Sequence, residues 1–243
     1  MFRKLSAHGR TRSSLVLTVA LTALVVVFNP TSTGEQLRGM LGIGQDLTFT
    51  ITTSGGSGYE FAVLQPDGLE PVTWDPCREI RYVVNPEGAP SGYAEVVTAS
   101  VADISRATGL RFDYVGTTDD RRFSDRSGPL DTTPAPVLIG WATPDEVPDL
   151  AGDVAGVGGA EAAHLERDRL TYVTGVVVLD RDPFAEMGHT LRRAVVTHEL
   201  GHVVGLEHVD DPGQLMYAET TSRSTLGAGD LDGLSILGSG PCR

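Results

Sequence analysis

The sequence predicts an α/β fold in which helices pack against a twisted, mostly parallel β-sheet. Alternating apolar residues indicate strands at 79–85 and 110–115, and short apolar or β-branched runs indicate strands at 137–142 and 172–179. A helical pattern lies between the first two strands, at 91–109. This β-α-β order predicts the class of the fold.

The first helix has recognisable ends. Ser91 is its expected N-cap, and Gly109 ends it, because a residue without Cβ readily adopts the left-handed conformation. Its buried face is predicted by four apolar residues at helical spacing: Ala94, Val97, Val101 and Ile104. Residues 116–136 are polar and rich in arginine, aspartate and proline, so we expect a long surface loop.

Two helices follow the last predicted strand. The first begins near Thr190 and stops at Gly205, with Val195, Val196, Leu200 and Val203 forming an apolar flank. The second is a short closing helix from Leu226 onward. Residues 157–161 form a short, glycine-rich stretch.

The chain divides into three parts. Residues 1–30 form a signal peptide or a signal anchor, because a basic start precedes sixteen uncharged residues, 13–28, and both outcomes remain open. Residues 31–70 read as a linker with a possible β-hairpin, whose arms are 47–51 and 59–63. Residues 71–243 form the main folded domain. We therefore expect an extracellular protein, secreted or anchored to the outer face of the cytoplasmic membrane.

Charge limits the choice of partners. The formal net charge is −13, although residues 1–12 carry four basic and no acidic residues. An acidic, mutually repelling body argues against nucleic-acid partners, and we expect a soluble monomer outside any membrane anchor.

The stretch 198–208 predicts a metal site. His198 and His202 are one helical turn apart, so both rings leave the same face of the helix. Gly205 lies where the chain must turn back, which brings His208 towards them as a third ligand. Three neutral imidazoles with one open tetrahedral position for water are the arrangement of a catalytic zinc site, and Glu199 is not needed as a ligand.

The spacing H-E-x-x-H-x-x-G-x-x-H resembles the signature of the metzincin zinc proteases. Those proteins carry a methionine turn beneath the metal, and Met216 fits that role. The sequence Leu-Met-Tyr at 215–217 is similar to that of the matrixin branch. Ala218 occupies the position at which other branches have a tyrosine that approaches the zinc. The resemblance runs from about Trp74 to the C-terminus and is specific at 198–217.

The resemblance implies a zincin-like fold of about five strands, with an antiparallel edge strand above the cleft, an active-site helix and a C-terminal helix. It implies a zinc-dependent endopeptidase in which Glu199 is the general base and acid. The edge strand would bind a protein or peptide substrate as an extra strand, and Gly158, Gly159 and Ala160 are the candidates for that contact.

The sequence leaves three questions open: the function, the state of the cysteines and the presence of a second ion. A catalytically silent relative, or a surface protein with a structural metal site, would retain the histidines without turnover. Cys77 and Cys242 pair most simply in a disulfide, whereas a matrixin-like latency switch would instead place the Cys77 thiolate on the zinc. Calcium is a possible second ion near Asp153, Asp180 and Asp182, although such aspartates are usually caps or turn formers.

Overall fold

The computed structural model describes residues 58–124, 126, 134–166, 169–218 and 223–242. They belong to one compact unit, Phe49–Arg243. No helix within these described ranges has the length and apolar character needed to cross a membrane. The predicted signal segment, 1–30, and the hairpin arm at 47–51 lie outside the described residues.

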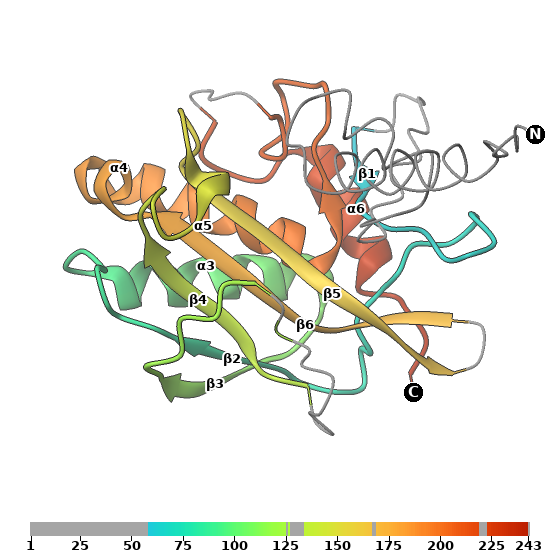
Figure 1. Ribbon diagram of the computed structural model, residues 1–243. Coiled ribbons are helices and arrows are strands. Elements are labelled where there is room, and N and C mark those ends of the chain that lie inside the picture. Colours follow the sequence, from blue (N-terminus) through green and yellow to red (C-terminus); the bar gives the residue numbers. More distant parts are fainter. Residues whose placement is uncertain (1–57, 125, 127–133, 167–168, 219–222, 243) are drawn as a thin grey trace, which may run out of the picture. The chain divides into compact units, whose positions relative to one another are not determined.

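The described residues form seven strands, four α-helices and one short 3₁₀ helix (Figure 1). Their bounds are β1 (Glu60–Phe61), β2 (Ile80–Val84), α3 (Tyr93–Thr108), β3 (Phe112–Thr117), β4 (Val137–Ala142), η1 (Pro148–Leu150), β5 (Gly156–Glu166), β6 (Arg169–Asp180), α4 (Arg181–Glu186), α5 (His189–Val204), β7 (Leu206–Glu207) and α6 (Ala228–Leu237).

The main sheet has five strands in the order β3-β2-β4-β6-β5. Strands β2, β3, β4 and β6 are parallel, and β5 pairs antiparallel with β6 at one edge. The predicted fold class is therefore confirmed, including its antiparallel edge strand. Strand β4 is buried along its whole length, which explains why 137–142 is continuously apolar instead of alternating.

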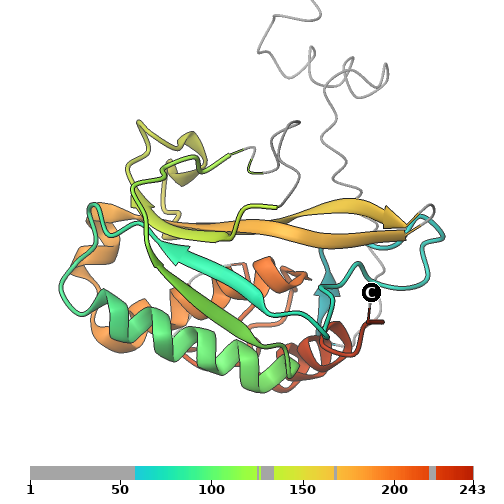
Figure 2. The ribbon, with the colours of Figure 1, turned by 90° about the horizontal axis from the view of Figure 1, so that it is seen from below.

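Helices α3, α5 and α6 lie on one face of the sheet, as Figure 2 shows. The main core fills the space between these helices and the strands, and Ile104, Ile139 and Leu200 are among its fully buried members. A smaller cluster around Leu150 of η1 covers part of the other face. The sheet is thus packed on both sides, as expected for parallel strands.

Some local expectations were wrong. Helix α3 is preceded by Gly92 in the left-handed conformation, with φ of 79°, and no side chain caps it, so Ser91 is not the N-cap. Gly109 does end this helix in the left-handed conformation, as predicted. The glycine-rich stretch 157–161, which contains the edge-strand candidates, belongs to a much longer strand, because β5 continues to Glu166 and forms a hairpin with β6. Helix α4 was not predicted.

Residues 58–70 pack against the main domain. Within the predicted arm 59–63, strand β1 pairs antiparallel with β7, which directly follows the active-site helix expected from the sequence. The hairpin with 47–51 stays a prediction, since that arm is not among the described residues. The packing nevertheless extends the folded body upstream of residue 71.

Candidate metal centre

Helix α5 and the turn behind it bring the three histidines together. His198 and His202 are one turn apart on α5, which ends at Val204. Gly205 follows with φ of 116°, and its N–H donates to the carbonyl oxygens of Gly201 and His202, both at 3.1 Å. Only glycine adopts this conformation readily. The reversal leads through β7 to His208.

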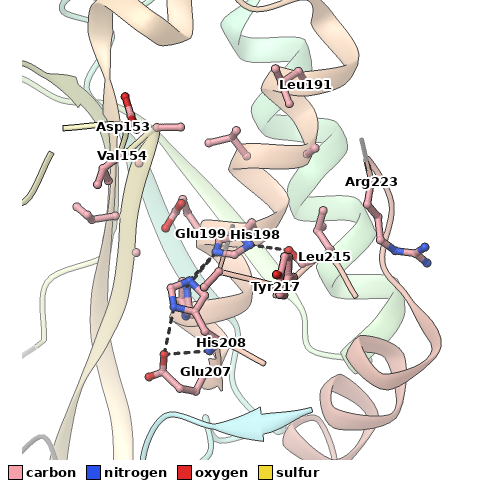
Figure 3. Close-up of a pocket in the computed structure, with 18 of the residues that line it drawn as sticks. Asp153, Val154, Leu191, His198, Glu199, Glu207, His208, Leu215, Tyr217 and Arg223 are labelled. Atoms are coloured by element: carbon pink, nitrogen blue, oxygen red, sulfur yellow. Dashed lines mark hydrogen bonds and ion pairs between the residues drawn. The ribbon is translucent and has the colours of Figure 1, made fainter. Parts of the chain in front are cut away.

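The Nε2 atoms of the three rings converge at one point. His198 Nε2 lies 3.1 Å from His208 Nε2, and His202 Nε2 lies 3.2 Å from each of the other two. Figure 3 shows His198 and His208 facing each other beside Glu199. A tetrahedral zinc ion with Zn–N bonds of about 2.0–2.1 Å separates its nitrogen ligands by about 3.3–3.4 Å. The triangle therefore has nearly the size that zinc requires.

The opposite ring nitrogens fix the orientation of these ligands. His198 Nδ1 lies 2.7 Å from the Leu215 carbonyl oxygen, and His202 Nδ1 lies 2.9 Å from the Leu206 carbonyl oxygen. A carbonyl only accepts, so each Nδ1 carries the hydrogen and each Nε2 of a neutral ring keeps a lone pair. Lone pairs this close repel one another unless a cation lies between them. The donor set thus fits a metal ion.

Burial keeps two of the rings neutral. It lowers the pKa of His202 to about 3, with a further lowering by His198 and His208, and it lowers the pKa of His198 as well. Neutral imidazole is the form that ligates zinc. The side chain of His208 is 45% exposed, so it is the ligand held least by packing.

Glu199 lies beside the histidines and is almost completely buried. Burial raises its pKa to about 8 in the absence of a metal ion. A bound dication would favour the ionised carboxylate and so act against this shift. A buried carboxylate with a raised pKa next to a metal site is suited to accepting and returning a proton near neutral pH.

Strand β5 approaches α5 at Glu199. A Cβ on Gly158 would lie only 2.9 Å from the Cα atom of Glu199, and a Cβ on Gly156 would lie 3.1 Å from its Cγ atom. Side chains at these two positions would push the strand away from the helix. The glycine-rich pattern therefore has a packing role, and Gly156 is a site residue that the sequence analysis missed.

The turn around Met216, where the sequence analysis expected a methionine turn, packs against α5. Met216 is buried, and a Cβ on Gly201 of α5 would approach its sulfur within 2.7 Å. The buried Asp230 of α6 accepts hydrogen bonds from the N–H groups of Leu215 and Gly227, at 2.6 and 2.7 Å. It also accepts one from Met216 N–H at 3.3 Å. Sequence analysis placed Asp230 in the closing helix but gave it no such role.

The histidines line a cleft with a volume of about 510 Å³. Residues from the start of β5 form one side, including Gly156 and Gly158, and α5 and the segment around Tyr217 form the other. Gly158, Gly159 and Ala160 all lie on β5, where they pair with β6 on one side only, because β5 is the last strand of the sheet. Within the described part of the chain no strand pairs with the outer edge of β5, and the start of this strand borders the candidate metal centre.

The cysteines lie elsewhere. Cys77 and Cys242 are joined in a disulfide, with Cα atoms 5.2 Å apart, so Cys77 offers no free thiolate to the metal. Among the described residues, Asp153, Asp180 and Asp182 are not part of any group of three or more converging metal-ligating side chains. Asp180 precedes α4 and Asp182 pairs with Arg181, whereas Asp153 lines the cleft.

The sheet thus has an antiparallel edge strand, and three histidines converge as metal ligands would. The family model of the matrixins matches residues 156–237, from the start of β5 to the end of α6. The expected resemblance to the matrixin branch of the metzincins is confirmed over this part of the chain. The match supports a zinc metallopeptidase relationship. No curated protein matches the chain.

Proposed function

We propose that this protein is an exported zinc-dependent endopeptidase. The observation that carries the proposal is the triangle of three Nε2 atoms, 3.1–3.2 Å apart, in a cleft between Glu199 and a free strand edge. His198, His202 and His208 would hold the ion. The matrixin match to residues 156–237 supports the same reading.

The chain's own residues supply the proton transfers. A zinc ion at this position would acidify a water molecule and polarise the carbonyl group of the substrate. Glu199 is within the same cleft, so its carboxylate takes the proton released by the attacking water and returns it to the leaving amine. The hydrogen bonds from His198 and His202 to backbone carbonyls keep both Nε2 atoms directed at the point where a metal ion would bind.

The substrate would bind as an extended strand along β5. Gly158, Gly159 and Ala160 lie on this edge strand, and those of their backbone groups that point away from β6 would form hydrogen bonds with a peptide main chain. Ala194, Val195 and Leu215 add apolar side chains to the lining of the cleft. A protein or peptide substrate fits these features, and no nucleic-acid partner is needed.

Export is part of the proposal because of residues 1–30. Their basic start and uncharged run direct the rest of the chain across the membrane, with cleavage and anchoring as the two outcomes. The Cys77–Cys242 disulfide agrees with an oxidising, extracellular location.

Cleavage of an unfolded protein substrate tests the proposal. We expect the purified protein to cut it, a chelator to abolish cleavage, and added zinc to restore it. Glu199→Gln should still bind zinc but lose at least about 100-fold in kcat, because proton transfer contributes roughly 10²–10⁴-fold.

Glu95→Gln provides the matched control, since Glu95 is an exposed residue on α3. It should cleave like the wild type. Wild-type turnover by Glu199→Gln would overturn the assigned mechanism. Zinc binding without any cleavage would instead favour a catalytically silent binding protein.

A further inference from the structure

We propose that residues 58–65, which we call the clamp, hold the third histidine in position for the metal. The proposal deepens the proposed function, because it assigns residues far from the zinc signature to the assembly of the same site. The clamp contains β1, which runs beside Glu207 and His208 in Figure 3 (cyan).

The loop that carries His208 needs external support. Only Gly205 and the two residues of β7 separate His208 from α5. The His208 side chain is 45% exposed, and its own backbone N–H donates to the Glu207 carboxylate at 2.9 Å, which is a contact within the loop. On its far side the loop is tied by Val209 N–H, which donates to the Met216 carbonyl at 3.0 Å.

The clamp supplies the contact on the other side. Glu60 and Phe61 pair with Glu207 and Leu206 in antiparallel register. Ala62 N–H donates to the Gly205 carbonyl at 2.9 Å, directly at the reversal.

The backbone of β7 also orients His202, the second metal ligand. The Leu206 carbonyl accepts a hydrogen bond from His202 Nδ1 at 2.9 Å. The strand that pairs with β7 therefore acts on two of the three ligands, on His208 through the chain and on His202 through this carbonyl.

The clamp is itself fixed at both ends. At one end Gly58 packs against α6, where a Cβ on Gly229 would lie 2.7 Å from the Gly58 Cα atom. At the other end the buried Gln65 exchanges two hydrogen bonds with the backbone of Leu170 in β6, at 3.0 and 2.9 Å. The position of β1, and with it the position of β7, is therefore set by α6 and β6.

Ala62→Pro in the full chain tests the clamp, because it removes the N–H that reaches Gly205 and leaves the zinc ligands unchanged. We expect zinc affinity, measured by competition with a chelator, to fall about 3- to 10-fold, the range expected for one lost hydrogen bond. Amide hydrogen exchange of residues 206–209 in the metal-free protein should accelerate by a similar factor.

Two variants separate positioning from general destabilisation. Ala62→Ser keeps the N–H, so its zinc affinity should return to within about twofold of the wild type. Val97→Ala creates a cavity in α3, away from the clamp, and should lower the unfolding temperature without changing zinc affinity.

Wild-type zinc affinity and wild-type exchange in Ala62→Pro would overturn the clamp. An equal loss of affinity in Val97→Ala would also overturn it. If the wild type binds no zinc, the proposed function fails, and the exchange of residues 206–209 in the metal-free protein still decides whether the clamp holds this loop.

Discussion

A single buried carboxylate, that of Asp230, holds the methionine turn against α6. It accepts hydrogen bonds from the N–H groups of Leu215, Met216 and Gly227, and its own N–H donates to the Gln214 side chain at 3.1 Å. Leu215 in turn offers its carbonyl to His198. One side chain on α6 is therefore linked through the turn to the first metal ligand.

Asp230→Asn is expected to destabilise the fold by about 2–3 kcal/mol, because an amide offers one acceptor oxygen and places N–H groups against N–H donors. Urea unfolding of the metal-free protein measures the change. Asp232→Asn is the control, since Asp232 is exposed on the same helix. Equal stabilities for the two variants would contradict the role given to Asp230.

At the level of single residues, the sequence predicted what depends on local spacing. The three histidines and the turn at Gly205 lie within eleven residues, so helical spacing aligns His198 with His202 and the turn brings His208 back towards them. Asp230, Gln65 and Gly156 depend on partners far along the chain, and no local pattern distinguishes them from an ordinary helix, linker or loop residue.

At the scale of elements, the strands and main helices followed from periodicity, whereas β7 and α4 did not. These two elements are short, with two and six residues, so too few positions exist for a period to appear. The extension of β5 to Glu166 also escaped prediction, because its pairing with β6, and not an alternating pattern, defines it.

The loop after β3 was expected to be only a polar surface segment, yet it contains a buried cation. Arg126 is 2% exposed and donates to the carbonyl oxygens of Arg122 and Pro136, at 3.0 and 2.8 Å. Its backbone N–H donates to the Glu161 carboxylate of β5 at 2.7 Å. Asp120 lies within 3.4 Å of the guanidinium and compensates its charge.

Because of the Asp120 carboxylate in this loop, we expect the stability of the fold to depend on pH in the acidic range. Hydrogen bonding from the Arg122 side chain, aided by its N–H and by Arg126, lowers the pKa of Asp120 from 3.8 to about 2. A carboxyl with a depressed folded pKa stabilises the fold while ionised, so its contribution is present above about pH 4 and is lost as the pH falls towards 2.

The unfolding free energies of the metal-free wild type and Asp120→Asn, measured between pH 5 and pH 2, test this prediction. Their difference should shrink as the pH falls. Asp119→Asn removes a neighbouring exposed charge from the same loop and serves as the control. A difference between wild type and Asp120→Asn that stays constant over this range would refute the proposed pKa.

At the scale of the whole molecule, one covalent link spans the folded domain. The Cys77–Cys242 disulfide joins residues 165 positions apart, just before β2 and after α6. The loop that it closes contains the entire sheet, α5 and all three histidines. In the chain-entropy account, such a long loop stabilises mainly by restricting the unfolded state, by up to roughly 5 kcal/mol.

The double variant Cys77→Ser/Cys242→Ser should therefore unfold at a lower denaturant concentration, with a loss of about 2–5 kcal/mol. Neither cysteine lines the cleft, and the histidines are oriented by backbone carbonyls and by the clamp. We accordingly expect the folded variant to keep its zinc affinity. A loss of both stability and zinc affinity would mean that the disulfide also shapes the metal centre. A loss of stability alone would show that the disulfide stabilises the whole fold, whereas local backbone contacts position the metal ligands.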